Sequence, residues 1–173
     1  MSVLSRGYIF VDCEAWGGSP RTGQLTEFGA VEFDAYFERG EWVTHHGLIV
    51  KSRPSLANPA VPERVVAKPE EEERVFKEFD LWLTERGFRR AIFWSDNVAF
   101  DWQWISDGFW RYIGRNPFGH SGRRISDFYA GLTGDIRNTQ AWKKLRITPH
   151  THHPVDDAKG NVEAFARLLR GER

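Results

Sequence analysis

The most constraining feature of the sequence is a short, uninterrupted apolar run near its start, Tyr8-Ile9-Phe10-Val11. The run ends in polar residues and is followed by the turn-forming segment Gly17-Gly18-Ser19-Pro20. Because successive residues are apolar, rather than every second one, the pattern predicts a strand that is buried on both faces. A strand of this kind belongs in the centre of a covered sheet.

The segments that follow predict the rest of that sheet. Near-alternation of apolar residues over 25–37 and a further run over 42–50, separated by turn-like residues 38–41, indicate a β-hairpin. Further strands are predicted at 91–95 and 124–129. Three strands of hairpin character, followed by alternating helices and strands, predict an α/β fold with a mixed five-stranded sheet flanked by helices.

Helical periodicity accounts for most of the remaining chain. Helices are predicted at 70–85, 98–113 and 156–170, with a weaker one at 139–144 and a proline-rich irregular connection over 52–69. The last helix is expected to bury one apolar stripe, formed by Ala158, Val162, Phe165 and Leu169.

Length and composition limit the class of protein. The 173 residues fit a single domain, 1–173, and 40% hydrophobic with 28% charged residues argues against a disordered or fibrous chain. No apolar stretch approaches the roughly 18 residues of a membrane span, and residues 1–7 lack the apolar run of a signal peptide. The single cysteine, Cys13, excludes an internal disulfide and a cysteine-based metal site. A cytoplasmic protein without membrane contact is therefore expected.

Two carboxylates mark the end of the first predicted strand. Asp12 and Glu14 are two residues apart, so their side chains project from the same face, about 6–7 Å from each other. Like charges at a buried strand end are costly unless a cation lies between them, which favours a divalent ion with oxygen ligands. The Asp-x-Glu pattern is common by chance, but its place beside a glycine-rich loop favours a functional site.

A third carboxylate, Asp101, lies one turn into a predicted helix that starts directly after a strand. If the first and fourth strands are neighbours, Asp101 approaches Asp12 and Glu14. The alternative is a first-turn aspartate that the helix dipole stabilises, with Asp96 or the next residue as the N-cap. Asp96 is assigned this capping role.

Half of the six histidines lie within residues 150–153, just before Asp156 and Asp157. Pro154 and the aspartate pair predict a helix start, with one aspartate as the cap and the other in the first turn. A loop histidine and a helical carboxylate can face one pocket while only the carboxylate is rigid, which suits a movable catalytic base. A chance histidine cluster on a mobile loop is the alternative interpretation.

Taken in order, these segments resemble the DEDDh 3′-5′ exonucleases, a family with the ribonuclease-H-like fold. The resemblance covers nearly the whole chain, whose length is similar to that of small free-standing bacterial or phage exoribonucleases. Asp96 departs from the family, because many relatives have histidine before the asparagine. The matching segments are Asp12-Cys13-Glu14, Leu25–Val31, Asn97-Val98-Ala99-Phe100-Asp101, and His152 with Asp157.

The resemblance implies a chemistry for these residues. The resemblance implies that two Mg²⁺ or Mn²⁺ ions are bound by Asp12, Glu14, Asp101 and Asp157. His152 would remove a proton from the attacking water and so complete the catalytic set. The implied reaction is 3′-5′ hydrolysis of single-stranded RNA to nucleoside 5′-monophosphates. A homodimer is expected from the resemblance and from the surplus of tryptophans, of which there are eight.

Aromatic residues beside the carboxylates are candidates for holding terminal bases, because stacking on an aromatic ring contributes roughly 1–3 kcal/mol per base. Trp16 and Phe100 are assigned this substrate-binding role, with a core position as the alternative for Phe100. Trp102 and Trp104 occupy different helix faces, so at most one of them joins the site.

The charge is balanced overall, with 24 basic and 24 acidic residues, which argues against a general nucleic-acid-binding polycation. Residues 1–85 nevertheless carry 9 basic and 15 acidic side chains, whereas 86–146 carry 11 and 5. This basic strip could hold the nucleic-acid backbone, with a solvated surface as the default interpretation. Its members are Arg123, Arg124, Lys143, Lys144 and Arg146.

Two rival functions stay open at this point. A DNA exonuclease of proofreading or repair type would use the same metal site, because only a contact to the 2′-hydroxyl separates RNA from DNA. A non-catalytic ribonuclease-H-like module that binds nucleic acid or protein is disfavoured by the complete set of four carboxylates plus His152.

Overall fold

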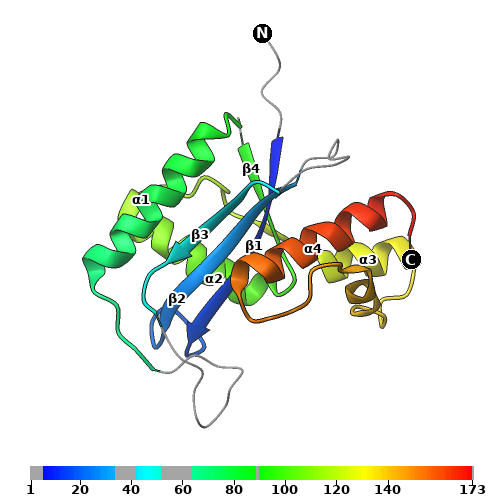
Figure 1. Ribbon diagram of the computed structural model, residues 1–173, viewed down its shortest axis with the longest axis horizontal. Helices are drawn as coiled ribbons and strands as arrows, with labels where there is room; N and C mark the ends of the chain where they lie inside the picture. Colours follow the sequence, from blue (N-terminus) through cyan, green and yellow to red (C-terminus); the bar gives the residue numbers. More distant parts are fainter. Residues whose placement is uncertain (1–5, 34–41, 52–63, 89, 173) are drawn as a thin grey trace.

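The computed structural model describes residues 6–33, 42–51, 64–88 and 90–172. The predicted hairpin turn at 38–41 and most of the predicted irregular connection lie outside these ranges. Within them, a sheet of five strands has the order β3-β2-β1-β4-β5. Helices cover both faces of the sheet (Figure 1). The predicted α/β fold with a mixed five-stranded sheet is confirmed.

The sheet has an antiparallel half and a parallel half. β1 (Arg6–Trp16) pairs antiparallel with β2 (Gln24–Phe33), which pairs antiparallel with β3 (Thr44–Leu48). On the other side of β1, β4 (Arg90–Ser95) and β5 (Gly122–Arg124) are added in parallel. β1 and β4 are therefore neighbours, which is the condition under which Asp101 was expected to approach Asp12 and Glu14.

The central strand is buried on both faces, as predicted: Ile9, Phe10 and Val11 have no exposed surface. Ile9 and Val11 belong to the core covered by α1 (Pro69–Glu85) and α2 (Val98–Gly108), whereas Phe10 belongs to a second core on the opposite face. Side chains alternate along a strand, so Asp12 and Glu14 share the face of Phe10.

That second face is covered by α3 (Ile125–Thr133), the 3-10 helix η2 (Ala141–Leu145) and α4 (Pro154–Leu169). Gly29 of β2 allows α4 to approach the sheet closely, because a Cβ there would lie 2.3 Å from the carbonyl carbon of Pro154. Gly29 is also the β2 partner of Asp12. The first turn of α4 is thus held over the strand pair that carries the first acidic motif.

The predicted strand at 124–129 is wrong, because β5 ends at Arg124 and the next residues form α3. Branched and aromatic side chains at 125–129 locally favour a strand. The buried positions of this segment have helical spacing, and packing on the second core decides its structure. These buried residues are Ile125, Ser126, Tyr129 and Ala130.

The other helices follow the prediction in extent, with differences at their ends. The predicted helix at 98–113 consists of α2 and a closing π-helical turn, η1 (Phe109–Ile113), which ends at Gly114 in the left-handed conformation. The helix predicted at 139–144 is the 3-10 helix η2. In α4, Leu169 is exposed, and Leu168 is buried in its place. No helix within the described ranges is both long and apolar enough to cross a bilayer.

The start of α4 differs from the prediction in a way that matters for the site. His153 occupies the N-cap position, and Asp156 and Asp157 both lie in the first turn. The prediction that one of these aspartates caps the helix is therefore wrong. Their charges at this end are stabilised by the partial positive charge of the helix N-terminus.

Candidate active site

Three of the four predicted carboxylates meet at one end of the sheet. Asp12 and Glu14 come from the last part of β1, and Asp157 comes from the first turn of α4. One carboxylate oxygen of each lies within 4.8 Å of the other two. Asp157 is buried, while Asp12 and Glu14 are half-buried, so the cluster keeps a path to solvent.

The fourth carboxylate, Asp101, is held directly beside this cluster. Its Oδ1 accepts a hydrogen bond from the backbone N–H of Cys13 (3.1 Å), and its Oδ2 accepts one from the Ser95 hydroxyl (2.6 Å). Cys13 separates Asp12 from Glu14 in β1, so the first bond fixes Asp101 against that pair. Ser95 was not among the predicted site residues, and only its place at the end of β4 could have suggested it.

Burial, together with nearby negative charge, raises the pKa values of Asp12, Glu14 and Asp101. Burial is the largest cause at Asp12, whose pKa lies well above its usual value, and the charges of Asp101 and Asp157 add to it. Burial likewise raises the pKa of Glu14 to about 8 and that of Asp101 to about 7. Such shifts show that the ionised pocket is unfavourable without a compensating positive charge.

The donor set fits hard divalent cations. Asp12, Glu14, Asp101 and Asp157 offer carboxylate oxygens only, which are the ligands that Mg²⁺ and Mn²⁺ prefer. A cation between them would offset the burial and the mutual repulsion that raise the pKa values of Asp12 and Glu14. The pocket can therefore collect divalent ions at the end of β1.

Two histidines from the loop before α4 reach this pocket. His152, predicted from its spacing to Asp157, has its Nδ1 atom 4.0 Å from Glu14 Oε1. Its φ of 60° is in the left-handed region, a strained conformation for a residue other than glycine that occurs often at functional sites. His150 was missed: its Nδ1 lies 2.7 Å from Asp157 Oδ2, and its ring packs edge-on against that of His152. The motif spacing carried no signal for this second contact.

Arg146 also differs from its predicted place in a solvated basic strip. Its side chain is only 12% exposed, its guanidinium donates to Asn161, and it lies 3.5 Å from Asp96. Its positive charge lowers the pKa of Asp12, against the larger effects that raise it. Arg146 therefore partly compensates the negative charge of Asp12.

The predicted capping role of Asp96 is wrong. Asn97 is the N-cap residue of α2, and Asp96 instead places its carboxylate 2.6 Å from Lys143 Nζ. Arg124 donates to the backbone carbonyl of Asp96 at 3.0 Å. Together with Arg146, these contacts gather part of the basic strip around one acidic residue beside the carboxylate pocket.

The aromatic residues assigned to substrate binding are both half-buried. The indole N–H of Trp16 donates to the carbonyl of Val65, and the guanidinium carbon of Arg64 lies 5.1 Å from the ring centroid. Phe100 packs edge-on against Trp104 and joins the core under α1 and α2. Stacking on a base stays a prediction for both.

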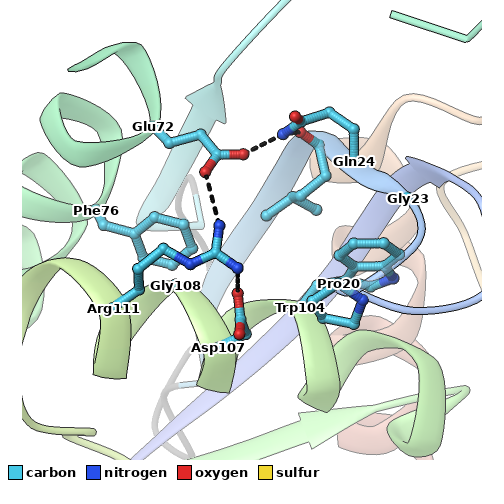
Figure 2. A pocket seen from close by; sticks show the side chains of 10 residues that line it. Pro20, Gly23, Gln24, Glu72, Phe76, Trp104, Asp107, Gly108 and Arg111 are labelled. Atoms are coloured by element: carbon cyan, nitrogen blue, oxygen red, sulfur yellow. Dashed lines mark hydrogen bonds and ion pairs between the residues drawn. The ribbon is translucent and has the colours of Figure 1, made fainter. Parts of the chain in front are cut away.

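A separate pocket lies between the start of β2 and the α1, α2 and η1 helices (Figure 2). Its charged groups satisfy one another: Arg111 contacts both Glu72 (3.6 Å) and Asp107 (2.5 Å), and Gln24 donates to Glu72. None of the predicted catalytic residues lines it. The candidate active site is therefore the carboxylate pocket at the end of β1.

No family model matches this chain, and no curated protein matches it.

Solved structures do match. A moderately thermophilic exonuclease I from Methylocaldum szegediense superimposes with a TM-score of 0.60 at 18% sequence identity. The match covers 98% of this chain and 41% of the exonuclease I chain. A full-length 3′-exonuclease gives a TM-score of 0.59 at 16% identity, and the match covers 96% of this chain and 81% of the 3′-exonuclease chain. The zinc-ion-bound E. coli exonuclease I complex with single-stranded DNA gives a TM-score of 0.54 at 15% identity, and the match covers 95% of this chain and 40% of the exonuclease I chain.

At these identities the similarity establishes the fold. The chain has the mixed α/β, ribonuclease-H-like architecture of these exonuclease structures. It spans about two fifths of the length of the exonuclease I chains and most of the 3′-exonuclease chain. A shared fold leaves activity to be argued from the site itself.

Proposed function

We propose that this protein is a metal-dependent 3′-5′ exonuclease, a hydrolase that shortens single-stranded nucleic acid from its 3′ end and releases nucleoside 5′-monophosphates. The observation that carries the proposal is the convergence of Asp12, Glu14, Asp101 and Asp157, from three separate elements, on one charged pocket. The fold shared with exonuclease structures supports it. A single exonuclease domain would occupy 1–173.

The four carboxylates would hold two divalent ions, Mg²⁺ or Mn²⁺. When bound, such ions supply an activated water and neutralise charge that develops on the leaving oxygen. A metal-bound form of E. coli exonuclease I is in keeping with this role. The contribution of Asp101 is rigidity, because its bonds to Cys13 and Ser95 fix its carboxylate before any ligand arrives.

His152 would accept the proton of the attacking water. Its side chain is 55% exposed and lies beside Glu14, so it can face a water molecule and also release the proton to solvent. His150 would act on Asp157, by holding the orientation of that carboxylate with a nitrogen 2.7 Å away. In this arrangement one histidine is a catalytic residue and the other a positioning residue.

Single-stranded RNA is the proposed substrate, on the resemblance to small free-standing exoribonucleases. DNA is the second candidate, because E. coli exonuclease I is described in complex with single-stranded DNA. Trp16 and Phe100 would contact the terminal bases. A homodimer and a cytoplasmic location are further parts of the proposal.

The proposal is tested with 5′-labelled single-stranded RNA and its DNA counterpart, each incubated with Mg²⁺, Mn²⁺ or EDTA. A descending ladder is expected with either metal ion and no cleavage in EDTA, with RNA degraded faster than DNA. A circular strand of the same sequence should resist, since it has no 3′ end. Cleavage of the circle, or an unchanged ladder in EDTA, would refute a metal-dependent exonuclease, and faster DNA cleavage would reassign the polymer.

A further inference from the structure

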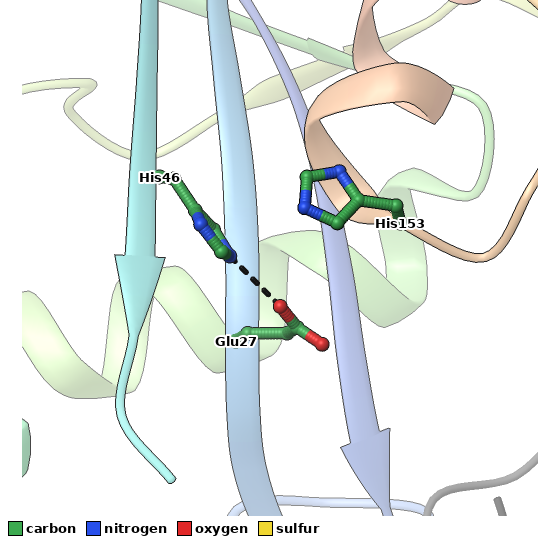
Figure 3. Close-up of side chains that lie close together, drawn as sticks. All are labelled: Glu27, His46 and His153. Atoms are coloured by element: carbon green, nitrogen blue, oxygen red, sulfur yellow. Dashed lines mark hydrogen bonds and ion pairs between the residues drawn. The ribbon is translucent and has the colours of Figure 1, made fainter. Parts of the chain in front are cut away.

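A second group of metal-binding side chains lies next to the carboxylate pocket. Glu27, His46 and His153 each offer one ligand atom, and these three atoms lie within 4.8 Å of one another. Figure 3 shows that they come from three elements, β2, β3 and the start of α4. The Nε2 atom of His46 is 2.8 Å from Glu27 Oε2, and the rings of His46 and His153 are 5.0 Å apart.

The fold fixes this arrangement through backbone features. His46 pairs with Gly29 across β2 and β3, and Glu27 is two residues from Gly29 on the same strand, so both side chains share one face. The missing side chain at Gly29 lets Pro154 contact that same face. His153, the residue before Pro154, is therefore placed over the Glu27–His46 pair.

His152 and His153, although adjacent in the sequence, contact different groups of side chains. His152 lies beside Glu14 of the carboxylate pocket, whereas the next residue, His153, faces His46. Glu27 is itself the β2 partner of Glu14. The two groups of ligands therefore stand on adjacent strands and share one loop, 150–153.

We propose that Glu27, His46 and His153 form a binding site for a borderline divalent ion such as Zn²⁺, which ties the loop 150–153 to the sheet. Two imidazoles and one carboxylate are a zinc ligand set, and imidazole favours zinc over Mg²⁺ or Mn²⁺. The three side chains are 35%, 23% and 48% exposed for His46, Glu27 and His153, respectively, so an ion reaches them from solvent and keeps an open position for water.

Small side-chain movements complete the geometry. Ligand atoms about 2.0–2.1 Å from a tetrahedral ion lie about 3.3–3.4 Å from each other. The Glu27 and His46 atoms, now 2.8 Å apart, must therefore open slightly, and the His153 atom lies within 4.8 Å of both. The positive ion would also lie close to Glu14, because Glu27 is the strand partner of Glu14. This zinc site does not depend on the proposed nuclease activity.

The test measures Zn²⁺ binding to the full chain by equilibrium dialysis in excess Mg²⁺, with Co²⁺ absorption as a report on imidazole ligands. The wild-type protein is expected to retain one zinc ion. His46→Ala and His153→Ala should each weaken binding by at least about 10–100-fold. His120→Ala removes an exposed histidine that stacks on Trp110 and should leave binding unchanged.

Amide hydrogen exchange distinguishes a clamp from simple binding. Zinc should slow exchange within residues 150–153 in the wild-type protein and have no such effect in His46→Ala. A zinc ion that is lost in His150→Ala but kept in His46→Ala would lie in the carboxylate pocket and overturn the proposal. Binding that is equal in all variants, or absent from the wild type, would overturn it too, whether or not the chain proves to be a nuclease.

Discussion

Asp101→Asn is expected to lower single-turnover cleavage of a labelled strand by about 10³-fold or more. The asparagine keeps a carbonyl oxygen that can accept the Cys13 hydrogen bond, so the local structure should persist. It lacks the negative charge that a divalent ion requires, and losing an ion removes several kcal/mol of transition-state stabilisation, with each 1.4 kcal/mol worth about tenfold in rate.

The matched control lies on the same helix. Asp107 is also in α2, but its carboxylate pairs with Arg111 in the separate pocket of Figure 2, which none of the four carboxylates of the candidate site lines. Asp107→Asn should therefore cleave within about twofold of the wild type, since it alters one surface ion pair. Full activity in Asp101→Asn, with a cooperative melting curve showing that it is folded, would exclude this carboxylate from the reaction.

His152→Ala is expected to reduce kcat by about 10²-fold or more, with little change in KM, because general-base catalysis contributes about 10²–10⁴-fold. Divalent-ion binding should persist, since the carboxylates are unchanged. Added imidazole should restore part of the rate, because the open side of this half-exposed site admits a small base. Single-turnover assays with and without imidazole measure both effects.

Another exposed histidine gives the comparison for this result. His120 stacks on Trp110, and His120→Ala should cleave at the wild-type rate, with no response to imidazole. An unimpaired His152→Ala protein would show that the proton leaves by another route. His150 would then be the next group to replace, because it also reaches the pocket.

Much of the fold follows from local patterns. The uninterrupted run at Ile9, Phe10 and Val11 predicted a strand with cores on both faces, and it lies at the centre of the sheet. The segment 125–129 was misassigned because its residues have strand propensity, while its burial pattern follows a helix. Local propensity is overridden there by packing between elements that are distant in the sequence.

The acidic part of the site could also be predicted, because strand ends and helix starts have sequence signals. Spacing placed Asp12, Glu14 and Asp157 at such ends, and the structure brings them together, although their catalytic role stays a prediction. The contacts of His150 and Arg146 could not be predicted in this way. They depend on how a loop and a 3-10 helix fold back over the sheet, and no periodicity records that.

Bound cations are expected to offset the unfavourable energy of ionising this buried acidic pocket, and the stability of the folded protein should therefore depend on pH and on metal. Glu14 has a raised pKa of about 8 in the folded protein, against about 4.5 when unperturbed, and that of Asp12 is raised as well. A raised carboxyl pKa means that the folded state binds the proton more tightly than the unfolded state. Without metal, the stabilisation of the folded state by this proton binding is fully present below about pH 4.5 and is lost as the pH rises through 8.

The most direct measurement is the melting temperature at pH 8 in EDTA and in Mg²⁺, for the wild type and Asp12→Asn. Ligand at 100 times its Kd adds about 2.7 kcal/mol, so Mg²⁺ should raise the wild-type Tm by about 5–10 °C, and by much less at pH 5. Asp12→Asn should melt above the wild type in EDTA and gain little from Mg²⁺. A wild-type Tm that is the same in EDTA and Mg²⁺ at pH 8, with Asp12→Asn melting lower, would contradict the account.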